Sequence, residues 1–117
     1  KILILGATFK ENTDDLRNST SIDLINSLSN KNLDVTIYDP ILMKTNYDKK
    51  KSFFHSKVKF LYNLKDIKKY NMIVVNNRSL EFRKLLNDYK NKNNVFLFDS
   101  RRFFNKKKFK NYGGSGV

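Results

Sequence analysis

The sequence contains no cysteine, so it can form neither a disulfide nor a thiolate metal site. Its single histidine, His55, cannot build a histidine-rich metal centre, and we expect a surface or packing role for it. No apolar run approaches the length of a membrane span, and no secretory signal peptide is present. These absences lead us to expect a cytoplasmic protein with no bound metal and no membrane partner.

Glycine is also scarce, with four residues in the chain. A dinucleotide-binding fingerprint needs three closely spaced glycines after the first strand, and only Gly6 stands there. Asp39 follows the second apolar run, where such folds place a ribose-binding acid, but without the fingerprint a turn-forming role explains it better. The remaining glycines fall in residues 103–117, a basic and then glycine-rich tail that we interpret as either a flexible end or a tight turn.

Acidic residues are few. The chain contains 24 Lys and Arg residues but 11 Asp and Glu residues, which gives a formal net charge of +13. Such a balance attracts polyanions, so a basic nucleic-acid-binding module is one possible function. However, 19 of the bases are lysines and 16 asparagines accompany them, which indicates a broad surface bias rather than a patch selected for phosphate. We therefore expect no nucleic-acid partner.

The pattern of apolar residues predicts one α/β domain over residues 1–117, a length that can bury one core but not two. Short apolar or alternating runs predict strands at residues 2–5, 34–38, 58–62, 72–75 and 95–98. Periodic apolar positions predict helices at about residues 20–31, 64–70 and 80–89. Because strands and helices alternate, we expect a three-layer Rossmann-like sandwich with a mainly parallel sheet.

A long polar segment follows the first predicted strand and is the strongest candidate for a binding site. Five charged residues lie in it: Lys10, Glu11, Asp14, Asp15 and Arg17. In an open α/β sheet, ligands bind at the carboxyl ends of the strands, and a connection this long is more often functional than a short turn. Two later strands also end in polar residues, at Asn76 and at Arg101, so three strand ends should meet at one edge.

Three segments in this order resemble the UDP-glucose/GDP-mannose dehydrogenase family, in its C-terminal nucleotide-sugar-binding domain. They are GATFKENTDDLRNS at residues 6–19, VTIYDP at 35–40 and VFLFDSR at 95–101. The first motif is specific, whereas the other two support it through their order and spacing. Members of this family oxidise the alcohol of a nucleotide-sugar to the acid in two steps with NAD.

The resemblance also implies roles for individual residues. Phe9 and Lys10 match family positions that contact the nucleotide-sugar, and Arg101 matches the arginine of an Asp-Gly-Arg motif near the nucleotide. Ser100 stands where the family usually has the glycine of that motif. Arg17 matches an arginine that reaches toward NAD held on the other domain. These assignments suit the binding of a diphosphate. Lysine offers a point charge to a phosphate group, and arginine offers a planar group that can donate two parallel hydrogen bonds.

The family's reaction passes through a thiohemiacetal on a cysteine, which this chain lacks. Because the chain also begins in mid-strand at Lys1, we expect a C-terminal domain that binds a UDP-sugar and carries no catalytic residue. NAD would be held mainly by a domain outside the chain, and the full-length enzyme would form a homodimer. Two alternatives stay open: the nucleic-acid-binding module, and a non-catalytic α/β scaffold for protein contacts.

Overall fold

The computed structural model describes residues 1–7, 20–44, 52–61, 63, 69–76, 79–87, 95–99 and 112–114. The described strands are β1 (Ile2–Leu5), β2 (Val35–Tyr38), β3 (Lys59–Leu61), β4 (Met72–Val75), β5 (Phe96–Asp99) and β6 (Tyr112–Gly114). The described helices are α1 (Thr20–Asn30), α2 (Pro40–Lys44) and α4 (Leu80–Asn87). Described helices lie between β1 and β2, between β2 and β3, and between β4 and β5.

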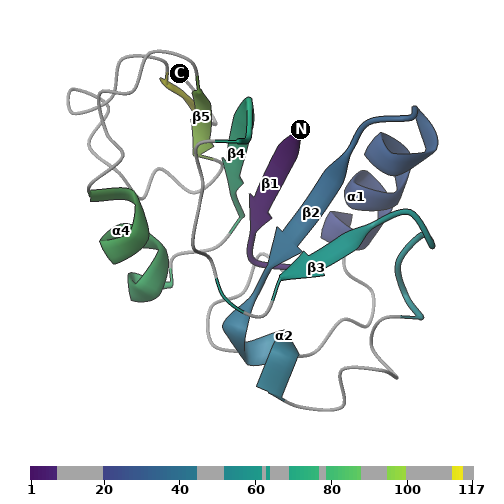
Figure 1. Ribbon diagram of the computed structural model, residues 1–117, viewed down its shortest axis with the longest axis horizontal. Coiled ribbons are helices and arrows are strands. Elements are labelled where there is room, and N and C mark those ends of the chain that lie inside the picture. The colour runs from purple at the N-terminus through teal and green to yellow at the C-terminus, as the bar shows by residue number, and fades with distance from the viewer. Residues whose placement is uncertain are drawn as a thin grey trace.

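Within this part of the chain, the strands form one parallel sheet in the order β3-β2-β1-β4-β5-β6. Figure 1 shows β1 near the middle, between β2 and β4. The chain builds one half of the sheet outward from β1 and then returns to build the other half. The order therefore reverses beside β1, and such a switch point is where open α/β sheets bind ligands.

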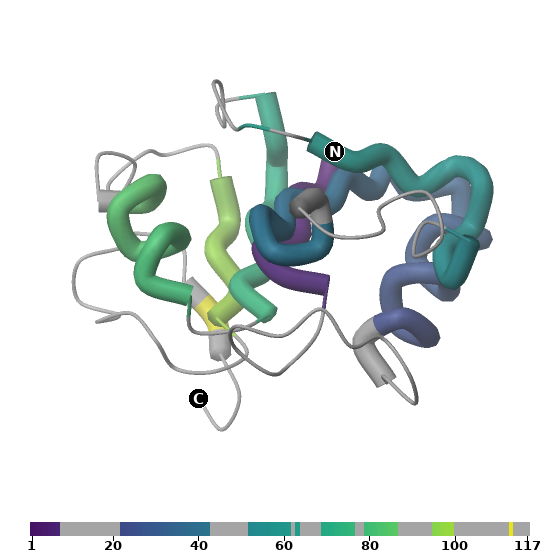
Figure 2. Tube along the Cα trace, turned by 90° about the horizontal axis from the view of Figure 1, so that it is seen from below, coloured from purple at the N-terminus to yellow at the C-terminus, as the bar shows by residue number. Residues whose placement is uncertain are grey.

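Helices cover both faces of the sheet because successive strand residues point to opposite sides. On one face, Ile4 packs in a cluster with Ile22 and Ile25 of α1. On the other face, Leu3 and Leu5 of the same strand pack in a cluster with Phe82 and Leu86 of α4. Figure 2 shows α1 and α4 on opposite sides of the sheet. This arrangement confirms the three-layer α/β sandwich with its parallel sheet.

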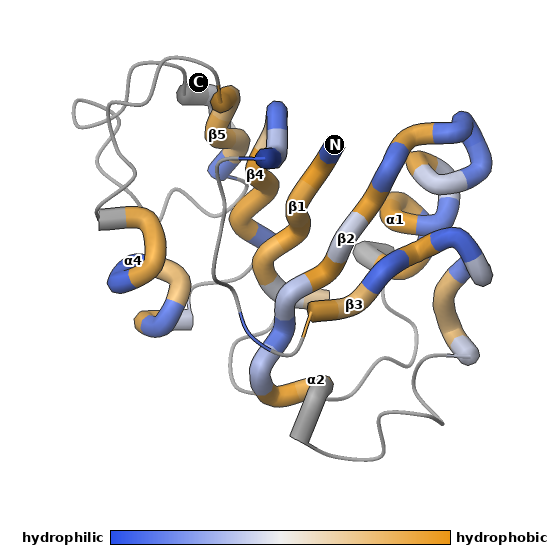
Figure 3. The backbone as a smooth tube through the Cα atoms, in the orientation of Figure 1, coloured by the Kyte–Doolittle hydropathy of each residue, from blue (hydrophilic) through white to orange (hydrophobic). Residues whose placement is uncertain are grey.

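β1 is apolar along its whole length, as Figure 3 shows, which is why its apolar run was recognisable in the sequence. α1 ends with two i→i−3 hydrogen bonds, from the amides of Lys31 and Asn32 to Leu28 and Ser29. Asn32 has a φ of 63°, a left-handed conformation that asparagine tolerates and that commonly ends a helix. Among the described residues, no helix is both long and apolar enough to span a membrane.

The tail differs from the prediction, because Tyr112–Gly114 forms β6 at the edge of the sheet and pairs in parallel with β5. A three-residue strand with two glycines has no apolar alternation, so the sequence contained no signal for it. Gly113 packs under Phe96, since a Cβ added at Gly113 would lie 2.8 Å from the Cζ of that ring. The helix predicted at residues 64–70 falls largely outside the described residues.

Candidate functional site

The carboxyl ends of the strands lie in register at one edge of the sheet. Leu5 pairs with Tyr38 on one side and with Val75 on the other, and Val75 pairs in turn with Asp99. The chain segments that follow β1, β2, β4 and β5 therefore leave the sheet at the same edge. We call this edge, with Gly6, Ala7, Asp39, Asn76 and Asp99 just at the strand ends, the carboxyl edge.

Asp39 is buried at the carboxyl edge, with 4% of its surface exposed. Its Oδ1 accepts hydrogen bonds from the amides of Ile41 and Leu42, each at 3.1 Å, so Asp39 caps α2 with Pro40 in the first helical position. Its Oδ2 accepts the amide of Ala7 at 2.8 Å. Three backbone donors thus occupy the carboxylate, which confirms the structural role expected for Asp39.

The same geometry argues against a Rossmann-type NAD site on this sheet. Such a site needs a glycine-rich turn for the pyrophosphate and an acid with free oxygens for the ribose. Gly6 has no companion glycine nearby in the sequence, and Asp39 uses both of its oxygens on the backbone. The residues present do not fit the cofactor, in spite of the strand order that this sheet shares with dinucleotide-binding folds.

Asn76 is the second buried polar residue at this edge, with 3% of its surface exposed. Its amide donates to the carbonyl of Leu5 at 2.9 Å, and its side-chain Nδ2 donates to the carbonyl of Gly6 at 3.1 Å. The amide of Gly6 in turn donates to the carbonyl of Tyr38 at 3.0 Å. Both neighbouring strands therefore hold the residues through which the chain leaves β1.

Tyr38 forms a contact that no motif in the sequence predicts. Its hydroxyl donates to Oε1 of Glu81, in the first turn of α4, at 2.6 Å. Burial raises the pKa of Tyr38, and the hydrogen bond to Glu81 and the charges of Glu81 and Asp39 raise it further. The two partners are separated by 43 residues, so no local pattern could have paired them.

The four residues assigned by resemblance, Phe9, Lys10, Arg17 and Arg101, lie outside the described residues, as does Ser100. The structure does locate the strand ends that precede them. β1 ends at Leu5 and β5 ends at Asp99, and β4 alone separates these two strands. With neighbouring strands about 4.8 Å apart, the two ends are about 10 Å from each other. The segments that carry Lys10 and Arg101 thus start close together at the carboxyl edge.

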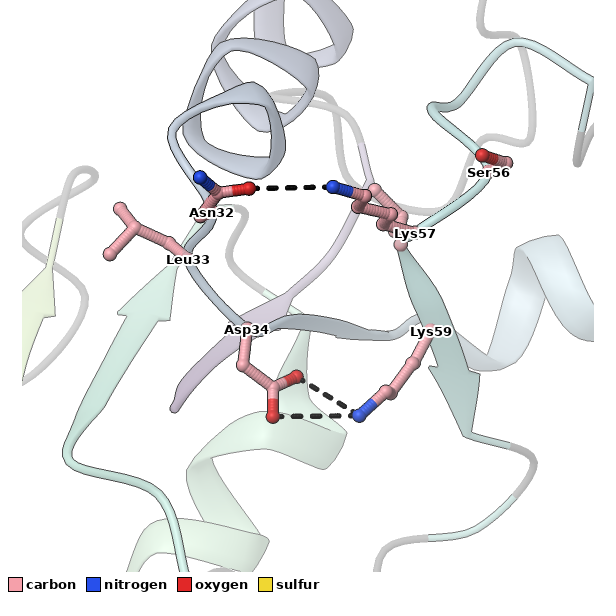
Figure 4. A pocket seen from close by; sticks show the side chains of 7 residues that line it. Asn32, Leu33, Asp34, Ser56, Lys57 and Lys59 are labelled. Carbon is pink, nitrogen blue, oxygen red and sulfur yellow. Dashed lines mark hydrogen bonds and ion pairs between the residues drawn. The ribbon is translucent and has the colours of Figure 1, made fainter.

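A shallow hollow of about 520 Å³ lies at the opposite edge, where β2 and β3 begin (Figure 4). Its lining residues are Asn32, Leu33, Asp34, Ser56, Lys57, Val58 and Lys59. Lys59 pairs with Asp34 at 3.2 Å, and Lys57 donates to Oδ1 of Asn32 at 3.4 Å. The Lys59 side chain is 66% exposed, and ion pairs in that setting contribute little. This hollow lies at the amino ends of the strands, at the other end of the sheet from the carboxyl edge.

His55 has a structural part in the turn before β3. Its Nδ1 accepts the amide of Lys57 at 3.1 Å, and its own amide donates to Oδ1 of Asn26 at 2.7 Å. Nδ2 of Asn26 also donates to the carbonyl of Phe53 at 3.1 Å, so α1 holds this turn through one side chain. These contacts support the packing role expected for His55.

Known proteins resemble this chain both in sequence and in fold. It is 34% identical over 85 residues to a UDP-glucose 6-dehydrogenase of Rickettsia felis, a match covering 72% of this chain and 18% of that protein. It is 31% identical over 94 residues to a GDP-mannose 6-dehydrogenase of Pseudomonas syringae, covering 74% of this chain and 22% of that protein. The chain thus spans about a fifth of the length of these relatives.

A GDP-mannose dehydrogenase from Pseudomonas aeruginosa, crystallised as a ternary complex, has a similar fold. The TM-score is 0.72 at 24% identity, over 97% of this chain and 27% of that one. The UDP binding domain of the UDP-glucose/GDP-mannose dehydrogenase family matches residues 3–106. That match takes in most of the chain, including the motif segment after β1 and the ends of β2, β4 and β5. The chain therefore belongs to the UDP-glucose/GDP-mannose dehydrogenase family, as its UDP binding domain.

Proposed function

We propose that this chain binds a nucleotide-sugar, most simply a UDP-sugar, at the carboxyl edge of its sheet. The observation that carries the proposal is the family match over residues 3–106, in a fold whose motif-bearing segments leave the sheet at one edge. The edge also lies at the point where strand order reverses, which favours a ligand there.

In this proposal Lys10 and Arg101 bind the diphosphate, and Phe9 packs against the base or a sugar face. The ammonium and guanidinium groups would make charge-assisted hydrogen bonds to phosphate oxygens, and the arginine could do so through two parallel donors. Arg17 would extend toward NAD bound by another part of a longer protein. The proximity of the ends of β1 and β5 supports one shared ligand for Lys10 and Arg101.

The activity of the longer protein would be NAD-dependent oxidation of the sugar C6 alcohol to a carboxylate, supplying uronic-acid sugar nucleotides. We propose that it acts in the cytoplasm as a homodimer. The chain described here contains no cysteine to form a covalent intermediate, so by itself it would bind the nucleotide-sugar and not oxidise it. The names of the relatives support this assignment, since they include both UDP-glucose and GDP-mannose 6-dehydrogenases.

The test is calorimetric titration of UDP into the 117-residue chain and three alanine variants. Each charge-assisted contact contributes roughly 1.5–3 kcal/mol, so Lys10→Ala or Arg101→Ala should weaken UDP binding by about one to two orders of magnitude. Lys107→Ala, in the basic tail, is the matched control and should change the affinity far less. Equal small effects from all three variants would indicate diffuse electrostatics, and no binding by the unmodified chain would contradict the proposed function.

A further inference from the structure

The residues through which the chain leaves β1 are held from both neighbouring strands by buried side chains. From the β2 side, Oδ2 of Asp39 accepts the amide of Ala7, and from the β4 side, Nδ2 of Asn76 donates to the carbonyl of Gly6. Ala7 is itself fully buried. We call Asp39 and Asn76, with these two bonds, the exit clamp.

Neither of these two bonds is needed to cap α2 or to pair β1 with β4. Capping of α2 uses Oδ1 of Asp39 alone, which leaves Oδ2 for Ala7. The backbone amide of Asn76 already bonds to Leu5 and so continues the pairing of β1 with β4. The two side chains therefore hold Gly6 and Ala7 beyond the last paired residues of β1.

Without such restraints the direction of the chain after β1 would vary, because the first residue after the strand is a glycine. Gly6 has a φ of 96°, a conformation that glycine adopts readily and other residues rarely do. Glycine also has access to many other conformations, so it does not by itself set the direction of the chain. The exit clamp adds two side-chain restraints to the backbone bond from the Gly6 amide to the carbonyl of Tyr38.

We infer that Asp39 and Asn76 are positioning residues that set the direction in which the segment carrying Phe9 and Lys10 leaves the sheet. This inference rests on the proposed function. Lys10 lies three residues beyond Ala7, so a small rotation at Gly6 would move its ammonium group by a larger distance. Binding groups need to be held within about 0.5 Å of their productive position, and supporting residues provide that.

Two variants break the exit clamp in different ways. Asn76→Ala removes the donor to Gly6. Asp39→Asn is more selective, because asparagine caps helices as well as aspartate does and can still accept the amides of Ile41 and Leu42. Its second atom becomes an NH₂ group, which faces the Ala7 amide as a donor and cannot accept from it.

Asn26→Ala is the matched control. Asn26 likewise bonds two backbone groups of a distant segment, those of Phe53 and His55, through its side-chain oxygen and nitrogen. It does so on α1, away from the carboxyl edge. A general loss of stability from deleting such an asparagine would therefore appear in this variant as well.

The first readout is the affinity for UDP, measured at a temperature where every variant is folded. We expect Asn76→Ala and Asp39→Asn to weaken binding roughly five- to thirtyfold, and Asn26→Ala to change it less than about twofold. If both clamp variants bind UDP as tightly as the unmodified chain, the inference is overturned. If Asn76→Ala does not fold, Asp39→Asn decides the question.

The second readout needs no ligand and separates this inference from the proposed function. We expect the Ala7 amide to exchange faster in Asp39→Asn, and the amide resonances of residues 8–19 to shift in both clamp variants but not in Asn26→Ala. If the unmodified chain binds no UDP, the proposed function fails, and these spectra still test the positioning of the segment. Unchanged exchange and unchanged resonances in both clamp variants would overturn the inference.

Discussion

Three buried side chains at the carboxyl edge have hydrogen-bond partners that the structure defines. Tyr38 donates to Glu81, Asp39 accepts three amides, and Asn76 donates to the carbonyl of Gly6. A buried polar group without a partner costs about 1–3 kcal/mol, so these bonds prevent a loss of stability more than they add to it. At the scale of single residues, the carboxyl edge is therefore held by hydrogen bonds between side chains and backbone, and by the hydrogen bond between Tyr38 and Glu81.

The Tyr38–Glu81 pair predicts a stability change in alkaline solution. The pKa of Tyr38 is raised from its ordinary value of 10.0, so above that pH the unfolded chain loses a proton that the folded protein retains. The free energy of unfolding should therefore fall as the pH rises above 10.0, by up to about 1.4 kcal/mol per pH unit from this residue. Tyr38→Phe lacks this dependence, so the stability difference between the two proteins should shrink with rising pH.

Urea denaturation of both proteins between about pH 8 and about pH 11 measures this difference. At the lower pH, Tyr38→Phe should be less stable by roughly 1.5–3 kcal/mol, the contribution of a hydrogen bond to a charged group. Burial and Glu81 both raise the pKa of Tyr38, so Glu81→Gln should weaken this dependence and leave the part that burial causes. Parallel curves for the unmodified chain and Tyr38→Phe would show that the Tyr38 pKa is not raised.

At the scale of elements, β6 is a short edge strand covered by one side chain of its neighbour. Gly113 pairs with Phe98 and also lies under the ring of Phe96, which is 41% exposed at the sheet surface. An aromatic ring that covers a glycine on a neighbouring strand offsets the missing side chain of that glycine. β6 should therefore be the strand whose pairing is most sensitive to a surface substitution.

Phe96→Ala should expose the backbone of β6 and lower the free energy of unfolding by about 1–2 kcal/mol, since the ring is already partly exposed. The amides of Tyr112–Gly114 should exchange with solvent faster. Leu80→Ala is a suitable control, because Leu80 is also apolar and is 68% exposed on α4. Equal exchange of the β6 amides in Phe96→Ala and in the unmodified chain would argue against this role.

At the scale of the whole molecule, the net charge of +13 raises the question of nucleic-acid binding. The family match favours a nucleotide-sugar partner instead. The described basic residues around the hollow are themselves partnered, Lys59 by Asp34 and Lys57 by Asn32. We therefore expect duplex DNA to bind weakly, in the range of about 10⁻⁴–10⁻⁶ M that sequence-independent contacts give at physiological salt.

Fluorescence anisotropy with labelled DNA duplexes of different sequence, over a series of salt concentrations, measures this binding. Affinity should fall steeply as salt rises, with no preference among the sequences. A submicromolar complex that persists at physiological ionic strength would favour the nucleic-acid-binding alternative over the proposed function.

Local patterns in the sequence were sufficient to predict most of the elements and the class of the fold. The apolar runs at residues 2–5 and 72–75 are visible in the sequence because central strands are buried on both faces. The periodicity of α1 is visible because one side of that helix packs on the sheet. The motif at residues 6–19 was enough to indicate the family. The roles of Phe9, Lys10, Arg17 and Arg101 stay predictions, since these residues lie outside the described structure.

Other features were decided only by the tertiary structure, because they join residues that are far apart in the chain. The bond from Asn76 to Gly6 spans 70 residues, and that from Tyr38 to Glu81 spans 43. β6 has no apolar pattern of its own and exists through pairing with β5 and cover by Phe96. A local pattern reports which face of an element is buried, whereas partners across the sheet are selected by strand order and register, which only the folded chain establishes.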